Sequence, residues 1–309
     1  MPTTGTATFN LNVNEMIEEA FERCGKELRT GYDFRTAKRS MNLLTIEWAN
    51  RGINLWTIEQ NQIPMVTGQV IYPYPVDTID MYDTVIRTSA GVASNQTDIN
   101  ISRISESDYL TIPNKLANGR PIQVWINRQS GQENATDITL DGGITATDTT
   151  ITLSSTANLA VTGFIKIGNE TIGYANIDGN DLINVYRGQN NTTAAVHADG
   201  AAITVQNLPC INVWPTPNAP GDQYTFVYTR LRRIQDAGSG TYVQDIPFRF
   251  IPAMVAGLAY HLSMKLPDVD PGRIPLLKAQ YDETFQMAAD EDRDKAPARW
   301  VPRNTFYFR

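Results

Sequence analysis

The chain has 309 residues, enough for about two domains that each bury their own core. Its 26 Lys and Arg residues against 33 Asp and Glu residues give a formal charge of −7, whereas a protein that coats nucleic acid carries an excess of basic residues. Hydrophobic residues make up 41% of the chain and charged residues 19%, which excludes a mainly disordered protein. Two histidines and two cysteines leave few metal ligands, and we expect no cofactor.

Neither secretion nor membrane insertion is indicated by the sequence. Residues 1–6 contain no basic residue, and no apolar run follows them. The most apolar stretch, residues 251–258, is far shorter than the ~20 residues of a membrane span. We therefore expect a protein that is made in the cytoplasm and makes no contact with a membrane.

Two helices are predicted within the first 52 residues. Asn12 or Asn14 can cap the first helix, and a second helix follows Gly31 and ends before Gly52. The apolar stripe of the first helix consists of Met16, Ile17, Ala20, Phe21 and Cys24. Its remaining positions are crowded with carboxylates at Glu15, Glu18, Glu19 and Glu22. This acidic set fits a solvated helix face or the lining of an acidic channel.

The apolar period changes to two after Leu55. Residues 62–66 and 70–72 predict a hairpin with Gly68 in its loop. Further strands are predicted at 83–88 and 123–128, and at 210–215 and 224–230, the last two antiparallel to each other across a turn at 217–222.

Residues 131–205 have a different composition and contain only two basic residues, Lys166 and Arg187. Short alternating runs separated by turn formers predict a small all-β module. The strands on either side of the module, ending near Arg128 and starting near Cys210, would form a hairpin if it were removed, so we interpret it as an insertion at a hairpin tip. His197 lies in a loop of the module without a second histidine or cysteine nearby, and a structural hydrogen bond is expected of it.

The C-terminal part is predicted to be helical again. Pro247 opens one helix, and a second runs from Ile274 to about Met287. The last residues, 295–309, contain two prolines, four aromatic residues and no acid, so we expect them to pack as an arm on a partner or, alternatively, on their own domain.

Together these elements predict an α+β fold. It consists of a helical bundle formed by both chain ends, a small antiparallel β-sheet and an inserted all-β domain. The expected parts are a helical core with an extended C-terminal arm (1–56 and 244–309), an antiparallel β region (57–130 and 207–243) and the inserted domain (131–206).

The order of segments resembles the head-to-tail adaptor, or connector, proteins of short-tailed phages. The resemblance rests on residues 41–56, 67–72, 211–217 and 246–255, which frame most of 10–130 and 207–295. The insertion resembles a recurrent module of phage tail proteins through residues 165–174 and 187–201. Minimal adaptors lack such a module, and our hypothesis for it is a contact with tail fibres or the nozzle.

The resemblance implies a structural virion protein and not an enzyme. It implies assembly in the host cytoplasm into a homo-oligomeric, dodecameric ring at the head–tail interface. Such a ring docks on the portal protein, extends the channel for double-stranded DNA without sequence-specific binding, and provides a platform for nozzle or tail fibre proteins. A net negative charge suits a conduit for DNA.

Two sets of residues are candidates for these contacts. The portal-binding set on the C-terminal arm is Arg299, Trp300, Arg303, Phe306, Tyr307, Phe308 and Arg309. The channel-lining set is Glu15, Glu18, Glu19 and Glu22. The alternatives are a tail protein that binds carbohydrate or the host surface through the insertion, and a tail-associated cell-wall hydrolase with two carboxylates ~5–10 Å apart.

Overall fold

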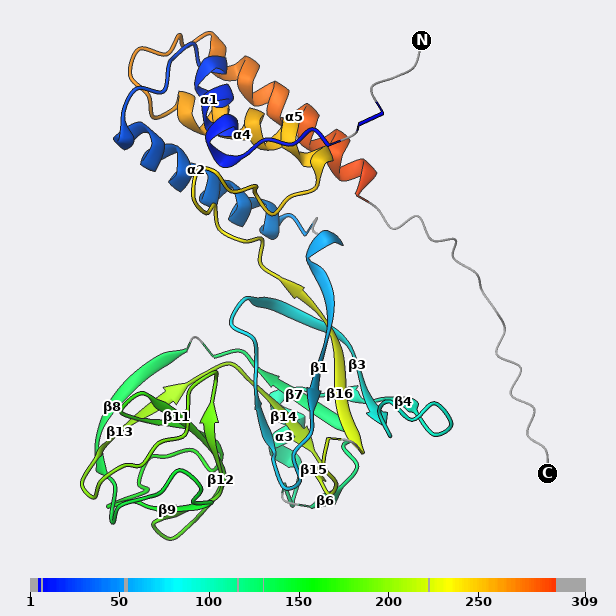
Figure 1. The fold of residues 1–309 in the computed structure, drawn as a ribbon, viewed down its shortest axis with the longest axis vertical. Coiled ribbons are helices and arrows are strands. Elements are labelled where there is room, and N and C mark those ends of the chain that lie inside the picture. The colour runs from blue at the N-terminus through cyan, green and yellow to red at the C-terminus, as the bar shows by residue number, and fades with distance from the viewer. Residues whose placement is uncertain are drawn as a thin grey trace, which may run out of the picture. The chain divides into compact units, whose positions relative to one another are not determined.

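The computed structural model describes residues 5–6, 8–52, 55–115, 117–129, 131–221 and 223–292. The chain divides into two compact units. Residues 1–58 and 232–309 make up the first, here called the helical unit, and residues 59–231 make up the second, called the β unit. Figure 1 shows helices from both chain ends, coloured blue and orange, gathered in the helical unit.

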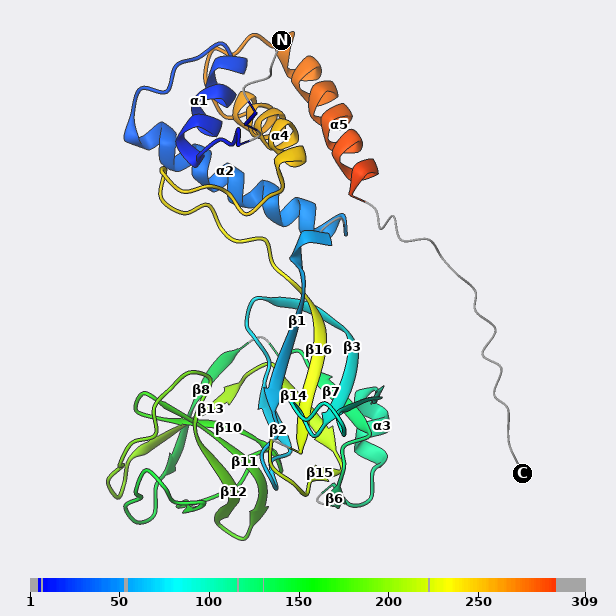
Figure 2. The same cartoon turned by 45° about the vertical axis from the view of Figure 1, so that its right-hand side comes forward.

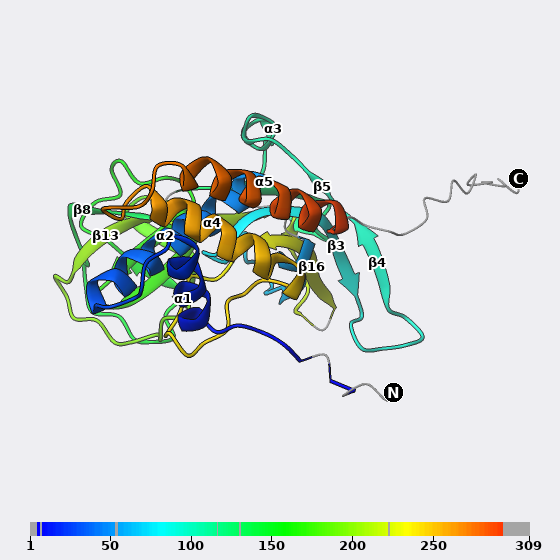
Figure 3. The ribbon, with the colours of Figure 1, turned by 90° about the horizontal axis from the view of Figure 1, so that it is seen from above.

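Four longer helices build the helical unit. They are α1 (Val13–Arg23), α2 (Gly31–Asn50), α4 (Ile251–Ser263) and α5 (Arg273–Glu291), with short 3-10 turns at Leu55–Thr57 and Phe248–Phe250. Asn12 and Thr30 begin α1 and α2 with complete capping boxes. The helix α4 packs against the other three and lies between α1 and α5 in Figure 3.

The core of this unit is aromatic. The ring of Trp48 lies 5.4 Å from that of Phe250 and 5.5 Å from that of Phe285, and its Nε1 donates a hydrogen bond of 3.0 Å to the hydroxyl of Tyr281. Buried aromatic rings gain both from burial and from their tilted contacts. They join α2, which comes early in the chain, to α4 and α5, which come late.

Two four-stranded sheets share a core in the β unit, which also contains a two-stranded sheet. The first has the order β1 (Ile58–Pro64), β16 (Tyr224–Arg232), β3 (Thr78–Thr88), β4 (Thr97–Asn100). The second has the order β2 (Ile71–Pro73), β14 (Cys210–Trp214), β7 (Gln123–Asn127), β5 (Ser102–Arg103). The third pairs β15 (Thr216–Pro217) with β6 (Asn118–Gly119), and the short helix α3 (Glu106–Thr111) precedes it in the chain. Phe226 of the first sheet and Ile211 of the second are fully buried in the common core.

A six-stranded sheet, here called the inserted sheet, completes the β unit and is drawn in green in Figure 2. Its order is β8 (Gln132–Thr139), β13 (Ala202–Asn207), β10 (Gly163–Ile167), β11 (Glu170–Asp178), β12 (Asp181–Gln189), β9 (Thr150–Thr152). It has its own core, in which Ile165, Ile172 and Leu182 are fully buried. The Gly168-Asn169 turn joins β10 to β11, and a positive φ of 58° at Gly168 suits a residue without Cβ.

The expected fold class, a helical bundle with a small antiparallel sheet and an inserted all-β domain, is wrong. The described residues form sixteen strands in four sheets and only five α-helices, so the protein is mainly β. Strands of two residues, such as β5 and β6, are too short to show an alternating pattern. The β content therefore exceeds what the alternating apolar pattern predicts.

Two predicted strand pairings are also wrong, and a third is confirmed. Residues 62–66 and 70–72 do not pair as a hairpin, because β1 and β2 belong to different sheets. The strands β14 and β16 are likewise in different sheets. The pairing across the insertion is confirmed, since β7 and β14 are antiparallel, with Asn127 opposite Cys210.

Candidate functional site

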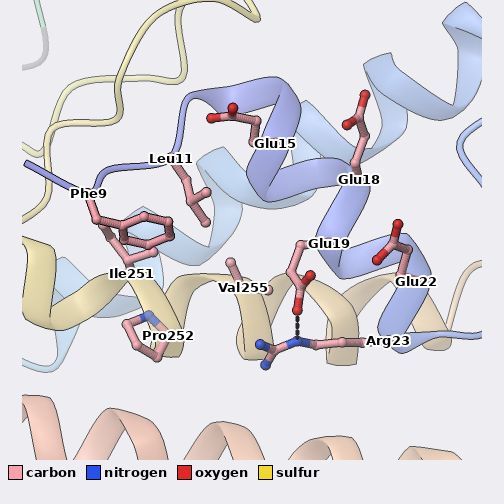
Figure 4. A pocket seen from close by; sticks show the side chains of 10 residues that line it. All are labelled: Phe9, Leu11, Glu15, Glu18, Glu19, Glu22, Arg23, Ile251, Pro252 and Val255. Atoms are coloured by element: carbon pink, nitrogen blue, oxygen red, sulfur yellow. Dashed lines mark hydrogen bonds and ion pairs between the residues drawn. The ribbon is translucent and has the colours of Figure 1, made fainter.

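The four predicted channel-lining glutamates line one pocket of the helical unit. The pocket has a volume of about 460 Å³ and lies along α1 and the start of α4 (Figure 4). Its other lining residues are Phe9, Leu11, Arg23, Ile251, Pro252 and Val255. We call this pocket the acidic groove.

The placement of these carboxylates follows from the amphipathic pattern of α1. Val13, Met16, Ile17 and Ala20 are fully buried against the core, so that the positions between them face outward. Arg23, together with apolar residues from the start of α4 and from the segment before α1, forms the rest of the groove, and Phe9 is 79% exposed. The groove therefore combines carboxylates with apolar surface.

Two of the four glutamates hold the helix itself together. The Glu15 carboxylate accepts a hydrogen bond of 2.8 Å from the Asn12 amide, and the Glu15 amide donates one of 3.0 Å to the Asn12 side chain. Glu19 accepts a hydrogen bond of 2.9 Å from Nε of Arg23, one turn later, as Figure 4 shows. Capping and such i,i+4 pairs stabilise a helix by fractions of a kcal/mol to about 1 kcal/mol each.

The other two glutamates are unengaged. Glu18 and Glu22 are exposed, and neither side chain has a hydrogen-bond or ion-pair partner among the described residues. The structure thus separates the predicted set into two structural carboxylates and two free ones. Within this set, only Glu18 and Glu22 have carboxylates without a partner among the described residues.

The chemistry of the acidic groove is recognition by charge and apolar contact. No histidine, cysteine or serine lines it, and the described part of the chain holds no cluster of three potential metal ligands. Such a surface attracts a cationic segment with apolar side chains and repels a polyanion.

All seven residues of the predicted portal-binding set lie outside the described residues. These are Arg299, Trp300, Arg303, Phe306, Tyr307, Phe308 and Arg309. Their assignment stays a prediction from the sequence.

A buried carboxylate that is not among the predicted site residues organises the inserted sheet. Glu170 begins β11, and its side chain is 1% exposed. Arg187 of β12 binds it through two parallel hydrogen bonds of 2.8 Å, from Nε to Oε1 and from Nη2 to Oε2. The amides of Gly188 and Ala195 each donate to it at 3.0 Å, and Nε2 of His197 lies 2.8 Å from Oε2.

These contacts shift the titration of Glu170. Burial alone would raise its pKa, but the hydrogen bonds from Arg187, from the backbone and from His197 outweigh burial and lower the pKa from 4.5 to about 2. The carboxylate joins the loop after β12 to the start of β11. The structural hydrogen bond expected of His197 is therefore confirmed.

The sequence contained a signal for this cluster. Lys166 and Arg187 are the only basic residues between 131 and 205, so a buried acid in this part of the chain has few possible partners. The pairing of β11 with β12, which brings Glu170 and Arg187 together, could not be predicted from the sequence.

None of the helices in the described part of the chain combines the length and apolar character of a membrane span. No family model matches the chain, and no curated protein matches it in sequence.

Proposed function

We propose that the protein is a structural head-to-tail adaptor of a phage virion. Copies of the chain form a ring that docks on the portal protein, extends the DNA channel and carries the nozzle or tail fibre proteins. The segments that support the resemblance fold as the end of α2, the entry to β2, the strand β14 and the start of α4. Their described residues are thus distributed over both units.

The observation that carries the proposal is the outer face of α1. It belongs to a unit that both chain ends build together, and it presents Glu18 and Glu22 without partners among the described residues. In a ring with α1 toward the axis, every copy adds two unpaired carboxylates to the channel wall. Like charge repels the phosphates of passing DNA, so the DNA slides without binding.

The C-terminal arm supplies the portal contact in this proposal. Residues 295–309 contain Lys295 and three arginines, with Trp300 and Phe306 among four aromatic residues. Aromatic and arginine side chains dominate the binding energy of protein interfaces. Arg299, Arg303 and Arg309 pair with carboxylates of the portal while the rings fill its pockets.

Removal of residues 296–309 tests the proposal. The full chain and the truncated chain are each mixed with portal rings from the same phage, and the masses of the complexes are measured. We expect the full chain to decorate the portal and the truncated chain to lose binding, while its circular dichroism and thermal unfolding stay unchanged. Normal decoration by the truncated chain would disprove the role of the arm.

A charge-reversed pair sharpens this test. Arg299→Glu with Arg303→Glu should weaken portal binding by roughly tenfold or more, because two charge-assisted contacts are lost. The matched control is Arg35→Glu with Arg39→Glu, which places the same change at the same spacing on exposed positions of α2. Equal losses in both variants would show that overall charge, and not the arm, governs binding.

A further inference from the structure

The second sheet of the β unit has a face that does not contribute to the common core. Ile211 and Val124 point into that core, whereas the alternate residues point to the opposite face. There Asn212 lies opposite Trp125, and Cys210 lies opposite Asn127. This opposite face lines a second pocket, with a volume of about 440 Å³.

Two other elements close the pocket over this sheet face. They are α3, through Tyr109 and Leu110, and the segment 160–164 that leads into β10 of the inserted sheet. Phe164 packs with Ile71 and Cys210 in a small apolar cluster at the sheet. The pocket is thus built by both parts of the β unit, and its volume lies within the ~300–1,000 Å³ typical of sites for small ligands.

An aromatic pair forms one wall of this pocket. The rings of Tyr109 and Trp125 stack with centroids 4.9 Å apart and planes inclined by 28°. Trp125 is half-buried, so part of its indole surface stays accessible. The electron-rich face of such a ring attracts the weakly positive C–H groups of a ligand.

Two buried polar atoms of the pocket residues have no partner in the described part of the chain. They are the hydroxyl of Tyr109 and Oδ1 of Asn212, on residues that are 4% and 1% exposed. A buried polar atom without a hydrogen bond is rare in native proteins, and one explanation is a missing ligand. The Asn212 amide nitrogen is engaged, since it donates to Sγ of Cys210 at 3.4 Å.

The charge of the pocket is small. Among the described residues that line it, Lys115 is the single cation, and its ammonium group donates to the carbonyls of Leu110 and Ile112 at 3.3 and 3.2 Å. Glu106 is the single acid. Uncharged amides at Asn127, Gln129 and Asn207 account for much of the remaining polar lining.

We propose that this pocket binds a neutral pyranose unit of a glycan. A sugar ring has an apolar C–H face that stacks on Trp125, and its hydroxyls both donate and accept hydrogen bonds. Both atoms are covered in the unliganded pocket, so binding includes a small rotation of the two side chains. One hydroxyl then pairs with Tyr109 and another donates to Oδ1 of Asn212, which satisfies both unpartnered atoms. The near-neutral lining favours an uncharged sugar over a phosphate ester or an acidic sugar. This inference does not rest on the ring or on the portal contact.

The test uses the full chain and an array of neutral oligosaccharides that contain glucose, galactose, N-acetylglucosamine or rhamnose. The oligosaccharide with the strongest signal is then titrated by calorimetry. Tyr109→Phe and Asn212→Leu each remove one polar atom with little change of shape. We expect each variant to raise the Kd by roughly tenfold, because a buried hydrogen bond is lost.

Tyr74→Phe is the matched control. Tyr74 belongs to the same unit, is also 4% exposed and also has a hydroxyl without a partner, but it lines a different pocket. Its substitution should leave the Kd unchanged. Val161→Arg is a further test variant. Val161 lines the pocket and is 61% exposed, so its substitution does not disturb the interior. An arginine there should block the pocket and weaken glycan binding.

Three results would overturn the proposal. The first is an array without any bound neutral glycan. The second is glycan binding that Tyr109→Phe, Asn212→Leu and Val161→Arg leave intact. The third is that the chain binds a proline-rich peptide but no glycan, and that the same three substitutions weaken this binding. That result would assign the pocket to a different class of ligand.

Discussion

At the scale of single residues, Glu170 shows how one buried charge fixes a loop. Its carboxylate accepts hydrogen bonds from Arg187 and from the amides of Gly188 and Ala195. Removal of one partner from a buried ion pair leaves the other charge uncompensated, which costs about 3–5 kcal/mol. We expect Glu170→Gln to lower the free energy of unfolding by this amount, measured in denaturant melts followed by circular dichroism.

The matched control for this substitution is Glu133→Gln. Glu133 lies in the same inserted sheet and pairs with Lys166 at 2.9 Å, but its side chain is 46% exposed. Because exposed ion pairs contribute at most about 1 kcal/mol, this variant should unfold almost as the wild type does. Equal destabilisation by both substitutions would show that the burial of Glu170 has no special effect.

The same carboxylate makes stability depend on pH. Its pKa is about 2 in the folded protein and 4.5 when unperturbed, so the unfolded state binds the proton first as the pH falls. The contribution, on the order of 3 kcal/mol, is complete above pH 4.5 and decreases as the pH falls toward 2. We expect the wild type to lose more stability than Glu170→Gln between pH 5 and pH 3 in the same melts. Parallel losses would contradict this assignment.

At the scale of elements, α4 can lie close to its neighbours because Gly257 has no side chain. A Cβ at this position would come within 2.8 Å of Cδ2 of Leu44 and 2.9 Å of Cε2 of Tyr281. Gly257→Ala should therefore destabilise the helical unit by about 1–3 kcal/mol through overpacking, although alanine favours helices by about 1 kcal/mol. The measurement is the loss of helical circular dichroism in urea.

Gly31→Ala is the control for that prediction. Gly31 is the first residue of α2, and a Cβ there meets nothing within 4 Å. We expect this variant to be as stable as the wild type or slightly more stable. A stabilising effect of Gly257→Ala would contradict the expected overpacking. It would show that α2 and α5 can move away from α4 without loss of packing.

The elements also show what the sequence could and could not predict. The observed α1 begins after Asn12 and α2 ends before Gly52, as their caps and apolar stripes indicated. The partners of the strands depend on contacts between distant residues. Met65 was expected in a hairpin with 70–72. Its amide instead donates a hydrogen bond of 2.9 Å to the carbonyl of Tyr224. Local patterns contain no information about such a partner.

The acidic groove and the pocket around Trp125 also differ in how far the sequence predicts them. The carboxylates of α1 were visible in the sequence because they share one helix, but their division into engaged and free groups depends on Asn12 and Arg23. The pocket around Trp125 combines α3, the second sheet and the inserted sheet. No local pattern in the sequence brings these three elements together.

At the scale of the whole molecule, the negative charge is uneven. Residues 59–231 contain 16 acidic and 8 basic residues, whereas the ranges that form the helical unit contain 17 and 18. The β unit thus carries a formal charge of −8 and the helical unit one of +1, which together give the −7 of the chain. The net charge of the chain is thus no argument that the helical unit repels DNA, and that role depends on the local charges of Glu18 and Glu22.

Reversal of these two charges tests the proposed channel wall. Glu18→Lys with Glu22→Lys turns the outer face of α1 from a surface that repels phosphate into one that attracts it, in every copy of a ring. We expect rings of this variant on portals to retain double-stranded DNA at low salt and to release it steeply as salt rises, as counterion release requires. The control, Asp282→Lys with Glu283→Lys, makes the same change at exposed positions of α5. If the control retained DNA equally well, α1 would not face the channel. DNA retention confined to the α1 variant would place Glu18 and Glu22 on the channel wall.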